Sequence, residues 1–112
     1  MAASGRLTTR AEFQRAAAKG RKAPMPGVVL QALPRDDREP ARLGFTVTKK
    51  IGNAVIRNRT RRRLKEAARL VLAERPVTGV DLVLIGRSGT AGRDFTALQD
   101  DMRRALAKVG LA

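Results

Sequence analysis

The sequence predicts a single α+β domain, in which three helices pack on a four-stranded sheet in the order α-β-β-β-α-β-α. Two kinds of apolar spacing predict this fold. Three segments repeat apolar residues every three to four positions, as on one face of a helix, whereas the segments between them alternate or are continuously apolar, as in strands. The chain has 112 residues, 43% of them hydrophobic, which suffices for one modest core. We therefore expect one domain over residues 1–112.

The first helix is marked at both ends by residues that cap helices. Thr9 and Glu12 have the spacing of a capping box, and Gly20 fits the C-terminal end. Between them, Phe13 and Ala16 belong to a narrow apolar stripe. Phe13 is therefore expected to lie half in the core and half at the surface.

Two or three strands are predicted before the second helix. Residues 28–33 (VVLQAL) are rich in strand formers, and residues 43–48 (LGFTVT) alternate between an apolar face and a small, polar one. The small face suits the close approach of another backbone. A further short strand is expected near Ile51. Residues 34–41 (PRDDREPA) combine two prolines with three acids, which predicts an exposed hairpin-type connection.

The second half of the chain predicts a helix, a strand and a helix. The second helix is expected over about residues 58–73, and residues 80–85 (VDLVLI) form the most apolar segment, which is typical of a central strand. A Gly-rich loop over residues 86–94 follows. The last helix begins near Phe95, and Gly110 fits its end. Its apolar positions follow helical spacing: Phe95, Leu98, Met102, Ala105, Leu106 and Val109.

A basic stretch over residues 49–65 (KKIGNAVIRNRTRRRLK) carries eight basic residues and no acid. If this stretch and the residues that follow it form a helix, one face of that helix carries the residues that can pack on a sheet: Thr60, Leu64, Ala67, Ala68 and Val71. The opposite face is basic: Arg61, Arg62, Lys65 and Arg69. Solvated helices usually interleave Glu with Lys or Arg, and here only Glu66 does. The planar guanidinium group binds phosphate oxygens in pairs and stacks on bases. The stretch therefore favours a nucleic acid over an acidic protein as partner.

The overall composition agrees with a nucleic-acid binder. There are 24 Lys and Arg against 10 Asp and Glu, which gives a net charge of +14 and a pI near 11.8. Neither Cys nor His is present, so disulfides and thiolate or imidazole metal sites are excluded. The first ten residues contain no long apolar run, so no secretory signal and no membrane span are expected, and the predicted compartment is the cytoplasm.

No catalytic residue and no metal ligand are predicted. Without His, Cys or Tyr, a protein-only nuclease would need carboxylates gathered around Mg²⁺. The ten acids are scattered, and the pair Asp100 and Asp101 is expected on the outer side of the last helix. A self-sufficient nuclease therefore remains a weaker alternative, to be tested by cleavage of RNA by the protein alone.

Recognition by base stacking or by a glycine loop is also weakly supported. Of the three aromatic residues, Phe45 and Phe95 have the spacing of core residues, which leaves Phe13 as the candidate for stacking. The segment 86–89 (GRSG) matches the GXXG loop of KH modules, but it follows a strand instead of joining two helices. We interpret it as a connection in which Arg87 is a possible phosphate contact. Binding should be led by charge and shape.

The segment 43–59 (LGFTVTKKIGNAVIRNR), followed by Arg61, Arg62, Leu64 and Lys65, resembles the signature of the bacterial ribonuclease P protein family. The triplet "RNR" is Arg57, Asn58 and Arg59. The resemblance extends to the length of the chain, the order of its elements, the first helix with Phe13 and the final amphipathic helix. A ribosomal or other structural-RNA binding protein would share the charge but not this ordered signature. A nucleoid-type DNA binder is a further alternative, although no helix-turn-helix pair is evident.

The resemblance implies a cytoplasmic ribonucleoprotein in which a catalytic RNA, with bound Mg²⁺, removes the 5′ leader of precursor tRNA. The protein would bind without breaking bonds, would hold no metal itself and would be monomeric when free. By position, the residues that face the catalytic RNA are Lys49, Lys50, Asn53, Arg57, Asn58 and Arg59. The residues that border or line the leader cleft between the first helix and the sheet are Phe13, Thr46, Thr48, Arg61, Arg62, Lys65 and Arg87. The resemblance also implies a left-handed β-α-β connection, an exception to the usual hand.

Three positions depart from the family pattern. Two places that often hold aromatics in the family are here Ala17, one turn after Phe13, and Gln31 in the first predicted strand. The resemblance then implies weaker stacking on the leader. Thr60 stands where an aliphatic residue is usual, a milder change because the threonine methyl can still pack.

Overall fold

The computed structural model describes residues 5–111 of the chain. It contains one five-stranded sheet, three α-helices and two short 3₁₀ helices. In chain order the elements are β1 (Gly5–Arg6), α1 (Arg10–Lys19), β2 (Arg21–Met25), β3 (Val28–Pro34), β4 (Arg42–Thr46), η1 (Lys49–Ile51), α2 (Ala54–Glu74), β5 (Val80–Gly86), η2 (Thr90–Gly92) and α3 (Phe95–Lys108). The α+β class and the three helices are as predicted.

Strand β5 lies at the centre of the sheet, in the order β1-β4-β5-β3-β2. It runs parallel to β4 and antiparallel to β3, so that Leu84 pairs with Phe45 on one side and with Leu30 on the other. The continuous apolar sequence of β5 explains this position, since a central strand is covered on both faces. The prediction of residues 80–85 as the central strand is confirmed.

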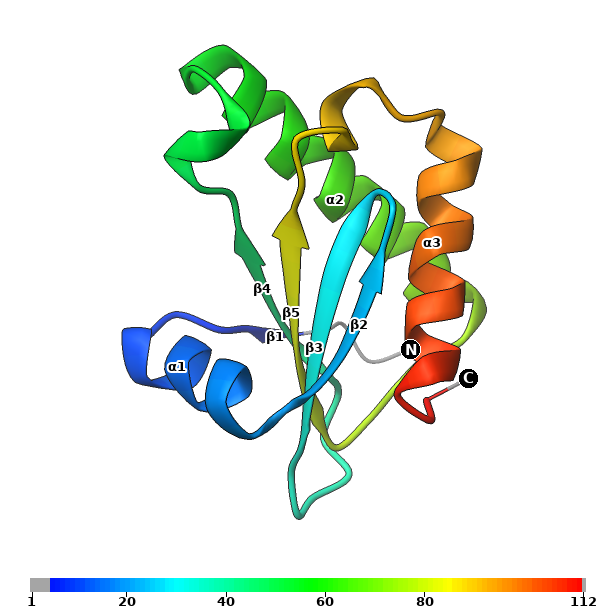
Figure 1. Cartoon of the computed structure of the whole chain (residues 1–112). Helices are drawn as coiled ribbons and strands as arrows, with labels where there is room; N and C mark the ends of the chain where they lie inside the picture. Colours follow the sequence, from blue (N-terminus) through cyan, green and yellow to red (C-terminus); the bar gives the residue numbers. More distant parts are fainter. Residues whose placement is uncertain (1–4, 112) are drawn as a thin grey trace.

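The helices cover the two faces of the sheet unequally. Figure 1 shows α1 on one side of the strands and α2 and α3 on the other. Because side chains alternate along a strand, Leu82 and Leu84 join the larger core under α2 and α3, whereas Val83 joins a smaller core under α1 with Ala16. Burying a leucine side chain contributes about 1.5–3 kcal/mol. Most of the apolar stabilisation therefore lies on the side of α2 and α3.

The strand count differs from the prediction of four. The segment near Ile51 is not a strand but part of η1, and the strands that were missed are β1 and β2. Strand β2 contains Pro24, which argues against a strand when the sequence is considered alone. It lies at the edge of the sheet, where a residue that cannot donate a ladder hydrogen bond is tolerated. Strand β1 is only two residues long, and it pairs in parallel with β4.

The connection over residues 34–41 is not a hairpin. Its flanking strands β3 and β4 do not pair, because β5 lies between them. The connection instead crosses the end of β5, where Pro40 bridges to Thr78 and the backbone N–H of Arg35 donates to the Gly79 carbonyl at 2.7 Å. Helix α2 then links the parallel strands β4 and β5. The left hand of that crossover, which the resemblance implies, stays a prediction.

The helix ends follow their capping residues. The capping box of Thr9 and Glu12 is formed in full, as predicted. Helix α2 starts at Ala54, four residues before the predicted start, because Asn53 caps it. In α3 the prediction for Asp101 is wrong. Only Asp100 is exposed, whereas Asp101 is buried and accepts hydrogen bonds from the Gly27 N–H at 2.9 Å and from Arg93.

Candidate nucleic-acid interface

The start of α2 is fixed by a turn that exposes basic side chains. Gly52 has a φ of 151°, a conformation that side chains disfavour, and a Cβ added there would lie 3.1 Å from Cδ1 of Ile56. Oδ1 of Asn53 then accepts a hydrogen bond from the Ile56 N–H at 3.0 Å. Lys49 and Lys50, in η1 before this turn, are exposed. Asn53 thus caps α2, a structural role that is separate from its predicted contact with RNA.

The inner face of α2 packs on the sheet as its spacing predicts. Its buried residues are Thr60, Leu64, Ala67, Ala68 and Val71. Thr60 donates its hydroxyl to the Ile56 carbonyl at 2.8 Å, and its methyl group contacts Gly86, where an added Cβ would lie 2.6 Å away. Threonine therefore packs here as an aliphatic residue would. The opposite face of the helix is left to the basic side chains.

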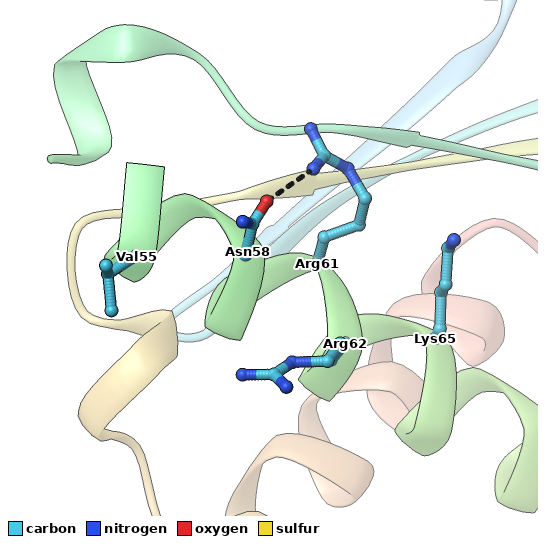
Figure 2. Close-up of a pocket in the computed structure, with 5 residues that line it drawn as sticks. All are labelled: Val55, Asn58, Arg61, Arg62 and Lys65. Carbon is cyan, nitrogen blue, oxygen red and sulfur yellow. Dashed lines mark hydrogen bonds between the residues drawn. The ribbon is translucent and has the colours of Figure 1, made fainter. Parts of the chain in front are cut away.

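That opposite face carries an open groove of about 380 Å³. The residues that line it form the outer α2 stripe: Val55, Asn58, Arg61, Arg62 and Lys65. Figure 2 shows them along successive turns, with Arg61 reaching to Asn58 and Arg62 extending in a different direction. The Arg61 guanidinium donates to Oδ1 of Asn58 at 3.4 Å. The guanidinium groups of Arg61 and Arg62 thus lie on either side of Asn58.

The basic residues of the stripe pair with no acid among residues 5–111. Seven of the ten acids are held by arginines elsewhere: Glu12, Asp37, Glu66, Glu74, Asp81, Asp100 and Asp101. Lys65 has another neighbour, since its Nζ lies 5.9 Å from the ring centroid of Phe45. The positive charge of the stripe therefore remains available to a polyanion.

Two neighbouring arginines of the basic stretch behave differently. Arg63 is turned inward, donates through Nε to the Thr90 carbonyl at 3.2 Å, and lies 5.5 Å from the ring centroid of Phe95. It fastens α2 to the loop before α3. Arg57 is half-buried, and its Nε is buried with no acceptor among the described residues.

A second surface lies between α1 and the sheet. A Cβ added at Gly44 would lie 2.5 Å from Cε1 of Phe13, so the ring rests directly on the glycine backbone. The small face predicted for residues 43–48 thus allows a close approach. Phe13 is half-buried as predicted, and so is Thr46, whereas Thr48 is exposed. Among the positions that depart from the family pattern, Ala17 is exposed on α1, and Gln31 is buried in β3.

Helix α1 is held on this surface by ion pairs that we name the Asp81 cluster: Glu12, Arg35, Arg42 and Asp81. Arg42 donates to both carboxylate oxygens of Asp81 at 2.8 Å and to Glu12 at 2.9 Å, while Arg35 reaches Asp81 at 2.7 Å. Burial would raise the pKa of Asp81, but the hydrogen bonds from Arg42 and Arg35 outweigh it and lower that pKa. Hydrogen bonds from the N–H groups of Thr9 and Thr8, then from the Thr9 hydroxyl, lower the pKa of Glu12 to about 2, and Arg42 assists.

The structure gathers some predicted site residues and separates others. The groove brings Asn58, assigned to the catalytic RNA, together with three residues assigned to the leader: Arg61, Arg62 and Lys65. Phe13 and Thr46 do not line this groove. Arg59 is exposed on α2. Arg87 lies after β5, where its guanidinium donates to the Met25 carbonyl at 2.9 Å.

Sequence reasoning missed Val55. Its side chain is 70% exposed, and it lines the groove beside the cationic groups. The signal was its spacing, because Val55 precedes Asn58 by three residues and Arg62 by seven, which places all three on one helical face.

Comparison with known proteins identifies the family. The ribonuclease P family model matches residues 1–110. The chain is 67% identical over 106 residues to the ribonuclease P protein component of Gluconacetobacter diazotrophicus, covering 95% of this chain and 91% of that protein. It is 51% identical to the same component of Ruegeria pomeroyi, covering 92% and 84%. The chain belongs to the ribonuclease P protein family.

The solved structures agree with the assignment to the ribonuclease P protein family. The Staphylococcus aureus ribonuclease P protein superposes with a TM-score of 0.80 at 25% identity, covering 97% of this chain and 98% of that one. The chain is accordingly a protein subunit of the ribonucleoprotein that processes the 5′ end of tRNA, in which the RNA performs the chemistry. No helix within residues 5–111 is long and apolar enough to cross a membrane.

Proposed function

We propose that this subunit binds the catalytic RNA through the start of α2 and the 5′ leader of precursor tRNA through the surface beside it. The observation that carries the proposal is the outer α2 stripe, whose arginines and lysine pair with no acid in residues 5–111. Guanidinium groups held on a rigid helix and free of carboxylates are suited to phosphate oxygens.

The proposed contacts divide along the chain. The catalytic RNA is assigned the residues that lead into α2 and its first turns: Lys49, Lys50, Asn53, Arg57, Asn58 and Arg59. The exposure of Lys49, Lys50 and Arg59 supports this assignment. The leader is assigned the residues that follow on α2 and those facing α1: Phe13, Thr46, Thr48, Arg61, Arg62, Lys65 and Arg87. The shared groove supports placing the two RNA strands side by side.

The required Mg²⁺ is proposed to be held by RNA. Among residues 5–111, no three His, Cys, Asp or Glu side chains gather as a group that could hold a metal ion. We further propose that the free protein is monomeric and that the complex works in the cytoplasm.

A reconstitution tests this function. The protein is mixed at low Mg²⁺ with a bacterial ribonuclease P RNA and precursor tRNA, and we expect 5′ processing that needs both components. Cleavage by the protein and Mg²⁺ without RNA would support the self-sufficient nuclease instead.

The leader assignment has its own test. Arg61→Ala and Lys65→Ala are expected to weaken binding of precursor tRNA to the assembled complex more than binding of mature tRNA, which has no leader. Arg69→Ala is a matched control, because Arg69 lies on the same helix but pairs with Glu66. Equal losses on both tRNAs would place Arg61 and Lys65 on the catalytic RNA or on the tRNA body.

A further inference from the structure

Val55 is an apolar side chain in a charged surface. Val55 and Ile56 are the exposed large hydrophobic residues of the described chain, at 70% and 39% exposure. Ile56 packs against Gly52, where an added Cβ would lie 3.1 Å from its Cδ1. Val55 belongs to neither hydrophobic core. A single exposed valine needs no explanation by itself, but this one forms a wall of the groove.

The other residues that line the groove indicate which chemical groups its ligand must have. Asn58 follows one turn after Val55, and its Oδ1 is engaged by the Arg61 guanidinium. That contact directs the Asn58 amide, whose NH₂ group remains a donor. Arg62 and Lys65 complete the far end. The ligand therefore meets an apolar surface, an amide and cations in that order along the helix.

An unpaired nucleotide has these three properties. Its base presents an apolar face and a hydrogen-bonding edge, and its phosphates are anionic. A base within an RNA duplex is unsuitable, because its faces are stacked on the neighbouring bases and only its edge is displayed in the shallow minor groove. The three phenylalanines do not line this groove, so Val55 is the one apolar residue among those that line it.

We infer that Val55 is a base-contacting residue: an unpaired nucleotide of the catalytic RNA lies with its base on the Val55 side chain, its edge at Asn58 and its phosphate at Arg62. This inference moves Arg62 from the leader contacts to the contacts with the catalytic RNA. The inference rests on the proposed function, in which Asn58 faces the catalytic RNA. Val55 lies one turn before Asn58, nearer to the start of α2. It would add to affinity without adding charge.

The test compares two properties of RNA binding, the affinity and its dependence on salt. Val55→Thr keeps the shape but replaces a methyl group by a hydroxyl, and it should weaken binding of the catalytic RNA by roughly three- to tenfold. The slope of log K against log salt should stay that of the unchanged protein. Arg62→Ala should instead reduce the slope by about 0.7, because one phosphate contact is lost. Val55→Leu should retain most of the affinity.

The controls separate failure of this inference from failure of the proposed function. Ala73→Ser changes an exposed residue of α2 outside the groove and should leave affinity unchanged. If Val55→Thr binds catalytic RNA like the unchanged protein while Arg59→Ala, at an exposed residue assigned to the catalytic RNA, binds it weakly, the inference is overturned and the proposed function stands. A loss seen only on precursor tRNA, and not on the catalytic RNA, would also overturn it. If neither variant affects any RNA, the proposed function itself fails.

Discussion

The Asp81 cluster and the outer α2 stripe use arginine in opposite ways. In the cluster, Arg35 and Arg42 surround a carboxylate that is 2% exposed, and every partner lies within 3 Å. In the stripe, Arg61 and Arg62 line a groove with an asparagine and a valine, and they pair with no acid in the described part of the chain, residues 5–111. In the cluster the positive charge is neutralised inside the protein, whereas in the stripe it remains available to bind a partner. Counting basic residues along the chain cannot separate the two, whereas their pairing does.

The largest effect is expected from removing the acid at the centre of the cluster. Asp81→Asn leaves Arg35 and Arg42 facing each other without a compensating charge, and breaking a buried pair in this way costs about 3–5 kcal/mol. Urea unfolding should show a loss near the lower value, because Arg42 is partly exposed. Asp36→Asn is a suitable control, since Asp36 is an exposed acid of the neighbouring connection. A loss for Asp81→Asn as small as that of the control would show that the cluster does not stabilise the fold.

The stripe should respond in the opposite way. Arg61→Ala combined with Arg62→Ala should leave the free energy of unfolding nearly unchanged, because surface changes usually stay within about 0.5 kcal/mol. The salt slope of RNA binding should fall by about 1.4, from about 0.7 for each contact to a single strand. Binding measured at several salt concentrations checks this. A marked loss of stability with normal RNA binding would reverse the roles assigned to the two regions.

Acid should weaken the cluster but not the stripe, which contains no carboxylate. The folded-state pKa of Glu12 is about 2, below its ordinary value of 4.5, and that of Asp81 is also lowered. Lowered carboxylate pKa values stabilise the fold above the unfolded-state value, and this contribution is lost as pH falls toward the folded-state value. The thermal midpoint should therefore drop between about pH 4.5 and pH 2. Arg42→Met should remove the part of this dependence that comes from Asp81 and leave the part that comes from Glu12, whose pKa is lowered mainly by Thr9 and Thr8. A dependence as steep as in the unchanged protein would show that Asp81 does not contribute to the acid sensitivity.

The smallest effect is expected when salt screens the net positive charge of the whole protein. With a net charge of +14, self-repulsion opposes folding of the free protein, and salt screens it over about 10 Å at 0.1 M. We expect the thermal midpoint to rise modestly with added salt, and more with a polyanion that binds the folded state. A midpoint that falls steadily with salt would mean that the ion pairs of the cluster outweigh the repulsion.

The sequence predicts those features of the fold that depend on local patterns. The capping box at Thr9, the central strand and the buried face of α2 follow from spacing and from capping chemistry, and all three are confirmed. Strand β2 was missed because Pro24 is permitted only by its edge position, which is a property of the whole sheet. The position of β5 between β3 and β4 is likewise a property of the whole sheet and not of any local segment.

The candidate site shows the same limit. The basic face of α2 could be predicted from helical geometry, but pairing between distant residues could not. Asp81 and Arg42 are 39 residues apart in the chain, and nothing in their local sequence indicates that they meet. Burial of Asp101 depends likewise on the approach of Arg93 and of the turn at Gly27. Val55 was overlooked because the second helix was expected to begin near residue 58, whereas α2 begins at Ala54.

Chemical footprinting of arginines would test most directly the claim that unpaired and paired arginines have different functions. The protein is treated with an arginine-specific dicarbonyl reagent, alone and in complex with catalytic RNA and precursor tRNA, and modification of each residue is quantified by mass spectrometry. We predict that RNA protects Arg59, Arg61 and Arg62, and leaves the exposed but paired Arg69 as reactive as before. Equal protection of Arg69 and the other three, or protection of Arg69 alone, would contradict the account.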